Sequence, residues 1–462
     1  MMKILNPRVL GLFVGAIVFA IVARIPIHGL EREGQLFLAV TLMTVIFWAF
    51  QVGNMGYVSG LYLALLVILN VAEPSVIFSP WTGSTMYFIV GAYLIASAVK
   101  HSGLGERIAM YVISKHITNF RSIIVVIFGL QILLSLIIPN SWARSLIIMA
   151  VMKQVIDSAG LSKKDAITIG LTVFTSSVPT SMLFLTGESA INLMIVDYAP
   201  VPVGWLTWAL YMGPPAIAAT LLTMAAILIV FKPTSEVKLD RTTMTGRFNQ
   251  LGKLTNKEKR VLFWLVVAII TWMTDSWHGI DIGWATLALT MLMGLPLIGE
   301  VIDAKHWGDV PVHVLIFLTA AIAIGRVGAV VGSNDFLANL MFPSSTPESL
   351  IFWAMIVMAI AIVIHMFLGS VIAVLSLIIP ATIAFTEPLG LNPLVPIFIV
   401  YMAVFGHFVF PFHHISIIVG VGDENGGYTN KEVMKLGFPL LIMVFVVVLL
   451  VQLPWWRLIG LL

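Results

Sequence analysis

The chain reads IHMFLGSV at residues 364–371 and FGHFVFPFHHIS at residues 405–416, each inside an otherwise apolar segment. Glycine relaxes a helix, and proline lacks a backbone N–H and crowds the preceding turn, so each segment is expected to be a helix broken at its middle. Unwound backbone at membrane depth is tolerated only where protein covers it or where it lines a cavity. Paired broken helices in the two halves of a chain therefore point to the binding site of a transporter.

The composition predicts a polytopic, all-α membrane protein. Of the 462 residues, 60% are hydrophobic and 10% are charged, and the mean hydropathy is +1.04. Soluble domains carry roughly 25% charged residues, so a soluble protein is excluded and a lipid bilayer is the expected surrounding. The small net charge of +3 gives no reason to expect a nucleic-acid partner. The absence of cysteine excludes disulfides and thiolate metal sites. No HExxH, GxSxG or P-loop motif occurs, so the protein is not expected to be an enzyme.

Hydrophobic segments of suitable length predict about eleven transmembrane helices in two repeats. Residues 1–56 are expected to form N-terminal helices, and residues 57–231 and 261–462 the two repeats. Between the repeats lies a basic loop, residues 232–260, with eight Lys and Arg residues against three acidic ones. Short basic loops stay in the cytoplasm, so this loop and the N-terminus, with Lys3 and Arg8, are expected on the cytoplasmic side of an inner or plasma membrane. The first apolar segment, from Val9 to Ile25, lacks a cleavage pattern and is expected to remain as a helix.

Two apolar pieces rich in small residues, 84–99 and 311–331, fit a simple span less well. Each precedes a short amphipathic piece, 105–116 or 335–342. They are interpreted as re-entrant hairpins followed by interfacial helices, with a plain span as the alternative.

The two halves share weak matches in one order. Asn140 aligns with Gly369, Gly160 with Gly390, and Pro179 with Pro411. An odd number of crossings in each copy would invert the second copy relative to the first.

The first break, Pro139-Asn140-Ser141-Trp142-Ala143-Arg144-Ser145, carries the residues best suited to an anion. A half-helix that begins inside the membrane offers free N–H groups and the positive end of its dipole. Asn140 and Ser141 can donate hydrogen bonds, and Arg144 lies one helical turn further on. Intramembrane charge is costly and usually functional. The alternative is an arginine that snorkels or pairs with a loop acid.

The other breaks offer hydroxyls and imidazoles. Gly369 and Ser370 follow His365, a hydroxyl cluster including Thr180 spans 175–181, and His407, His413 and His414 flank Pro411. For the histidines three interpretations stay open: contact with an anion, inert packing, and a metal site, which lacks a nearby acidic partner. Glu188 is either a proton carrier, because burial raises the pKa of a carboxyl group, or a cap at the end of the span.

At these breaks the chain resembles the divalent anion:sodium symporter (DASS) family, which carries a Ser-Asn-Thr motif at the bend of each repeat. Pro139-Asn140-Ser141 occupies the first place and Leu368-Gly369-Ser370 the second. The turn before the last span is FPFHHISIIVG at 410–420, and NKEVMKLGFP at 430–439 is similar to the family's run into the final helix. The likeness covers nearly the whole chain in order and spacing.

The resemblance implies a homodimer with a scaffold domain and a mobile transport domain that works as an elevator. It implies di- or tricarboxylate substrates of the succinate, 2-oxoglutarate, malate and citrate class. By position, Asn140, Ser141, Gly369 and Ser370 would line the substrate site, and residues 179–180 and 411–414 would complete its walls.

Departures from the family pattern bear on the coupling ion. Gly369 replaces the second Asn of the family motif, and Arg144, His413 and His414 place fixed cationic or titratable groups near the bends. A fixed cation can offset substrate charge in place of sodium. The sequence is therefore interpreted as a sodium-independent dicarboxylate exchanger without a cofactor. The alternatives are a sodium- or proton-coupled symporter and an anion channel.

Overall fold

The computed structural model describes residues 6–234, 246, 248–343, 347 and 349–462. Within these ranges the chain forms helices and no strand, and one isolated β-bridge joins Val421 to Tyr428. The prediction of an all-α membrane protein is confirmed. In the basic loop, Glu236, Lys238, Asp240, Arg241 and Arg247 lie outside the described residues.

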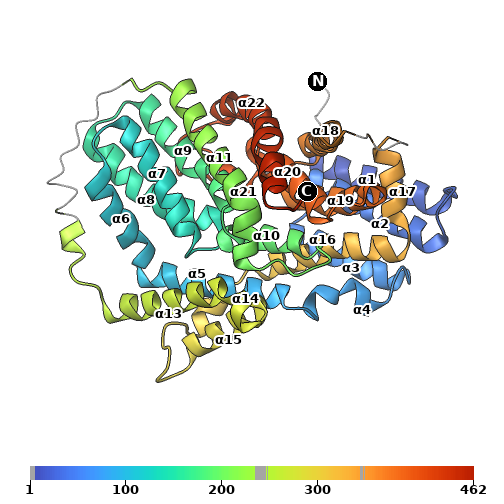
Figure 1. Ribbon diagram of the computed structural model, residues 1–462, viewed down its shortest axis with the longest axis horizontal. Helices are drawn as coiled ribbons and strands as arrows, with labels where there is room; N and C mark the ends of the chain where they lie inside the picture. Colours follow the sequence, from blue (N-terminus) through green and yellow to red (C-terminus); the bar gives the residue numbers. More distant parts are fainter. Residues whose placement is uncertain (1–5, 235–245, 247, 344–346, 348) are drawn as a thin grey trace.

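The first half contains the N-terminal helices and the helices α7 and α8 on either side of the first break (Figure 1). Its elements are α1 (Pro7–Arg24), α2 (Arg32–Ala49), α3 (Met55–Ile68), α4 (Pro74–Ile77), η1 (Ser79–Trp81), α5 (Thr85–Ser102), α6 (Leu104–His116), α7 (Phe120–Ser135), α8 (Ser141–Ala159), α9 (Lys163–Ser181), η2 (Leu185–Glu188), α10 (Ser189–Val196) and α11 (Trp205–Val230).

From α16 onward, the second half repeats the order of helices that begins at α5 in the first half, so that α16 and α17 correspond to α5 and α6, and α18 and α19 to α7 and α8. Its elements are α13 (Asn256–Met273), α14 (Asp275–His278), α15 (Ile282–Gly294), η3 (Ala304–Asp309), α16 (Val312–Val330), α17 (Ser333–Met341), α18 (Leu350–Leu368), α19 (Val371–Thr386), η4 (Glu387–Leu389), α20 (Leu394–Phe405), η5 (Pro411–His413), α21 (Ile415–Val419), α22 (Asn430–Val447), η6 (Val448–Gln452) and α23 (Leu453–Leu458).

Helices from the two halves pack on each other reciprocally. α3 of the first half packs on α16 of the second, and α15 of the second half packs on α5 of the first. Glycines allow both approaches: a Cβ at Gly56 would lie 2.6 Å from that of His313, and one at Gly91 would lie 2.9 Å from Thr286 Cγ2. Two related halves are expected to pack on each other in this reciprocal way. Close packing of helices in a membrane requires small residues at the contact.

α6–α9 lie on one flank of the molecule, and α20 packs on α18 and α19 (Figure 1). Every residue of α20 is buried, as is the whole of α9 from Thr168 to Ser181. By contrast, α1 leaves Phe13, Ile17 and Ile21 largely exposed, as a helix that faces lipid does.

Six described helices, or seven if the bent pair α5 and α6 is one span, are long and apolar enough to cross a membrane. Five shorter apolar helices of 10–17 residues accompany them. These shorter helices are Met55–Ile68, Phe120–Ser135, Leu185–Val196, Ile282–Gly294 and Leu394–Phe405. The number of crossings, about eleven by sequence, stays a prediction.

The predicted re-entrant turns inside 84–99 and 311–331 are wrong. Both pieces form continuous helices, α5 and α16, and the bend of 64° lies at the junction of α5 with α6. The small residues serve packing instead of turning: Gly91 meets Thr286, and a Cβ at Gly325 would lie 2.3 Å from the Tyr198 ring. The two amphipathic pieces are helical as predicted, as α6 and α17.

The chain folds back at 136–140, between α7 and α8. Gln131 Nε2 on α7 donates to Ser145 Oγ on α8 at 3.0 Å, although the two residues are 14 apart in sequence. A straight helix would separate them by about 21 Å. The first predicted broken span is therefore itself a helical hairpin.

Two of the three matches predicted between the halves differ in the structure. Asn140 is the N-cap of α8, and the N-cap of α19 is Ser370, so Asn140 corresponds to Ser370 and not to Gly369. Pro179 lies inside α9, whereas Pro411 opens η5 after α20 has ended, so these prolines are not equivalent. The Gly160–Gly390 match fits, because both end a helix with a positive φ, of 59° and 62°.

Candidate functional site

The first break is organised by Asn140, which begins α8. Its side chain accepts a hydrogen bond from Ala143 N at 3.0 Å and so satisfies one of the free N–H groups of the helix. Another is taken by Glu188, whose carboxylate accepts from Ser141 N at 2.9 Å. A buried carboxylate therefore already occupies the positive end of this half-helix. Glu188 acts as a cap, but on α8 and not on its own helix.

Arg144 is fully buried beside this cap and its guanidinium is held by four acceptors. Nη1 donates to the carbonyls of Ile138 at 2.7 Å and Gly187 at 2.6 Å, Nη2 donates to Ser181 Oγ at 2.7 Å, and Nε donates to Gln131 Oε1 at 3.3 Å. These bonds connect the turn of the α7–α8 hairpin with the end of α9 and with η2. Arg144 neither snorkels nor pairs with a loop acid; Glu188 supplies the opposite charge within the same cluster.

The hydroxyls of α9 bond back to their own helix. Thr180 Oγ1 donates to Ser176 O at 2.8 Å, and Ser181 Oγ donates to Ser177 O at 2.7 Å. These bonds give the hydroxyls partners inside their own helix, and α9 continues through Pro179, whose missing N–H would have bonded to Thr175 O. The break predicted at 175–181 therefore begins only after Ser181.

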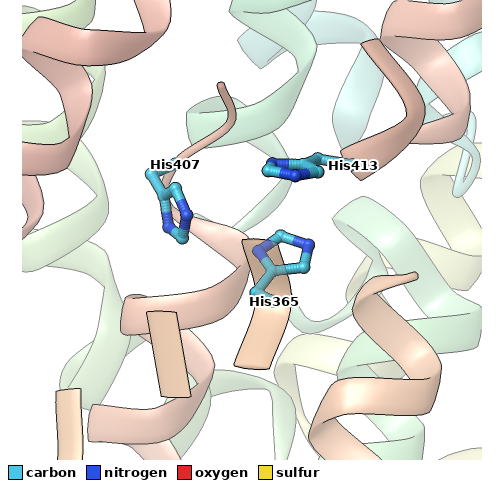
Figure 2. Close-up of side chains that lie close together, drawn as sticks. All are labelled: His365, His407 and His413. Carbon is cyan, nitrogen blue, oxygen red and sulfur yellow. The ribbon is translucent and has the colours of Figure 1, made fainter. Parts of the chain in front are cut away.

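The second break brings four histidines together. His365, near the end of α18, lies within ring-centroid distances of 5.1 Å from His407, 4.4 Å from His413 and 6.3 Å from His414. Figure 2 shows the rings of His365, His407 and His413 around one common space. Gly369, which ends α18, adopts the left-handed conformation with a φ of 62°, and a Cβ there would lie 2.5 Å from the Phe412 ring. A substitution at Gly369 therefore meets both backbone strain and a clash.

The predicted site residues thus fall into two clusters. Asn140, Ser141 and Arg144 surround Glu188, while Gly369, His413 and His414 surround His365. Among the described residues, no hydrogen bond connects the two clusters directly, and α20 contacts residues beside each of them. At one point Tyr401 Oη donates to Asn192 Oδ1 of α10 at 2.6 Å, and further along Ala403 O contacts His407 Nδ1 at 2.5 Å.

Sequence reasoning missed Gln131 and underrated His365 and Glu188. Gln131 stands alone as a polar residue inside the apolar run of α7, and an uncharged polar side chain buried at membrane depth must find partners. That isolation was the available signal. The grouping of His365 with His407 depends on tertiary packing and leaves no local pattern.

A cavity of about 330 Å³ opens elsewhere, between α5, α10 and α15. Thr85, Asp197, Asp281 and Arg326 are among its lining residues, and Arg326 Nη2 donates to Asp197 Oδ2 at 2.5 Å. None of the predicted site residues lines this cavity.

Helices that begin inside the membrane next to buried charged groups, here Arg144 and Glu188, are typical of membrane transport proteins. The chain belongs to the family described as the sodium:sulfate symporter transmembrane region, which it matches over residues 6–462. The resemblance to the divalent anion:sodium symporters is thereby confirmed. A family of transporters also agrees with the expectation that the protein is not an enzyme.

The similar proteins are distant in sequence. A protein of Cupriavidus necator called simply "Membrane protein" is 24% identical over 97% of this chain and 93% of its own length. An L-tartrate/succinate antiporter of Shigella dysenteriae is 23% identical, over 79% and 81% respectively. A putative malate transporter of Bacillus subtilis, YflS, is 23% identical over 66% of this chain and 64% of its own. The solved YdaH transporter of Alcanivorax borkumensis covers 93% of this chain and 98% of its own with 13% identity, but its TM-score of 0.49 is too low to establish a shared fold.

Proposed function

We propose that this protein is a secondary active transporter of dicarboxylates of the succinate, malate and 2-oxoglutarate class, and that it exchanges one dicarboxylate for another without sodium. The names of two relatives, an L-tartrate/succinate antiporter and a putative malate transporter, support the substrate class, and the first also supports exchange. Citrate is the larger substrate to be tested alongside them.

The observation that carries the proposal is the Glu188 carboxylate at the N-terminus of α8. Ser141 N–H donates to it, and Arg144 lies in the same buried cluster. This arrangement is built for a carboxylate, because main-chain N–H groups and the helix dipole favour negative charge. A substrate carboxylate would displace Glu188 from the Ser141 N–H group, with Asn140 and Ser141 around it, and Gly369 and Ser370 at the start of α19 would meet the other end. Thr180, His413 and His414 are proposed as its walls.

One observation favours the sodium- or proton-coupled symporter as second candidate. Glu188 offsets the charge of Arg144, so the pair contributes little net positive charge toward a substrate with two negative ones. A co-transported cation would then supply the missing charge.

Alternating access is proposed to follow the elevator mechanism that the resemblance to the divalent anion:sodium symporters implies, with the protein as a homodimer. The helices of 1–56 would belong to the scaffold, and the breaks within 57–231 and 261–462 to the moving part. The N-terminus and the 232–260 loop are proposed to face the cytoplasm of an inner or plasma membrane. Since the chain has no cysteine, single introduced cysteines can be labelled from either side without background to test this topology.

The exchange proposal is tested with purified protein in liposomes loaded with succinate, and with labelled succinate or 2-oxoglutarate outside, with and without sodium. Uptake that requires internal dicarboxylate and not sodium supports exchange. Sodium-dependent or proton-gradient-dependent uptake into empty vesicles would establish symport instead. A channel would give conductance without stimulation by internal substrate.

The binding residues are tested by a matched pair of serines. Ser370 and Ser349 are both N-caps, and each accepts a main-chain hydrogen bond at 3.4 Å, from Ala373 and from Phe352. Ser370→Ala and Ser349→Ala therefore lose the same cap, worth about 0.5–2 kcal/mol in general. Only Ser370 stands at the break, so only Ser370→Ala is expected to raise the KM for dicarboxylate. Equal KM values in the two variants would remove Ser370 from the site.

A further inference from the structure

Three histidines from separate segments converge next to the second break (Figure 2). His365 comes from the last turn of α18, His407 from the link after α20, and His413 from η5. One ring nitrogen of each lies within 4.8 Å of those of the other two. The chain must bring α18 and both sides of the α20 break together to make this cluster.

These imidazoles are buried and leave nitrogens unused. His365 and His407 are fully buried and His413 is 1% exposed. Within the part of the chain that the structure describes, neither nitrogen of His365 has a hydrogen-bond partner, nor does Nε2 of His407 or of His413. Buried polar groups almost always have a partner, so a cluster of ring nitrogens without one calls for a partner that is not part of the chain.

The orientation of His407 is the one that metal ligands show. Its Nδ1 lies 2.5 Å from Ala403 O, which places the proton on Nδ1 and leaves Nε2 as a free lone pair. A backbone carbonyl that fixes the tautomer in this way is the usual outer partner of a metal-bound histidine. His414 is held apart, because its Nε2 is bonded to His407 O at 3.1 Å. His413 Nδ1 accepts a hydrogen bond from Val409 N at 3.2 Å, which leaves the ring proton on Nε2. To bind a metal ion, His413 gives up this bond and offers either Nδ1 itself or, after its proton moves to Nδ1, Nε2.

We propose that His365, His407 and His413 form a binding site for a divalent transition-metal ion, with zinc as the best-fitting ion. Three imidazoles without a carboxylate suit zinc, nickel or copper and do not suit magnesium or calcium. Zinc–nitrogen distances of about 2.0–2.1 Å place tetrahedral ligands roughly 3.4 Å apart, so small side-chain rotations close the site. The fourth position stays open for water or an anion, as in other three-histidine zinc sites.

The test uses full-length protein purified without a histidine tag and stripped with a chelator. Cobalt(II) is added as the probe, because its visible absorption reports tetrahedral nitrogen coordination, and zinc is then used to compete. The variants are His365→Asn and His407→Asn, with His116→Asn as the matched control, since His116 is exposed on α6. Bound metal is also measured directly by elemental mass spectrometry.

One cobalt ion per chain is expected in the wild type and in His116→Asn, with at least about tenfold weaker binding in the other two variants. Zinc, but not magnesium, should raise the melting temperature of the wild type, because a ligand that binds only the folded state stabilises it. This last measurement decides the matter even if the histidine variants fail to fold. A wild type that binds no cobalt and gains no thermal stability from zinc would overturn the proposal. Metal binding is measured without transport, so its outcome is independent of the exchange assay.

Discussion

Replacing Arg144 by lysine keeps the charge and removes the planar fork that holds the first break together. In the wild type, Nη1 alone serves the carbonyls of Ile138 and Gly187, while Nη2 and Nε serve Ser181 and Gln131. The ammonium of lysine can replace Nη1, which leaves Gln131 Oε1 without a donor and removes the bond that Ser181 Oγ accepts, although this hydroxyl keeps its bond to Ser177 O. An unsatisfied buried group costs about 1–3 kcal/mol and a lost hydrogen bond about 0.5–1.5 kcal/mol, so Arg144→Lys is expected to destabilise the protein by roughly 1.5–4.5 kcal/mol.

The measurement is reversible unfolding in a titration of dodecyl sulfate against mild detergent, followed by the fluorescence of the thirteen tryptophans. Arg121→Lys is the control, because Arg121 is exposed at the start of α7 and the same exchange there should have little effect. A loss for Arg144→Lys below about 0.5 kcal/mol, the size of an ordinary surface effect, would refute the idea that its four bonds hold the hairpin.

Two more predictions use the same unfolding assay. Although burial alone would raise it, hydrogen bonds from Arg107 and Thr255 lower the pKa of Glu258 below its ordinary value. This pair therefore stabilises the fold fully above the unfolded pKa of about 4.3. Its contribution is lost as the pH falls through the folded pKa, and Glu258→Gln should remove that pH dependence; an unchanged profile would contradict the assignment. Gly170→Ala should cost about 1–3 kcal/mol, since its Cβ would lie 1.9 Å from Gly426 O. Gly129→Ala, with open space around it, should be neutral or stabilising, and a similar loss in both would count against close packing at Gly170.

The sequence was informative wherever local chemistry decides the structure. Asn140 begins a helix because its side chain can cap one, and the amphipathic pieces after α5 and α16 are helical because their periodicity allows nothing else so easily. The break at Gly369 follows from a residue that adopts a positive φ without strain.

It failed where one residue type serves two purposes. Glycine and alanine permit a turn as readily as close helix packing, so 84–99 and 311–331 were predicted to turn, although Gly91 and Gly325 are needed for contact. Pro179 lies in a segment that was predicted to break, but α9 continues through it to Ser181. The convergence of His365 with His407 and His413 depends on how α18 docks against α20, which no pattern along the chain encodes.

The reciprocal packing of the two halves has a consequence for biosynthesis. α3 and α5 leave the ribosome long before α15 and α16 are translated, so the grooves at Gly56 and Gly91 stay uncovered while the first half is already in the bilayer. A nascent chain paused at the basic loop would expose these grooves to lipid or to a membrane chaperone. Insertion and assembly are therefore separate stages, and the first half reaches its final shape only when residues 282–330 have been made.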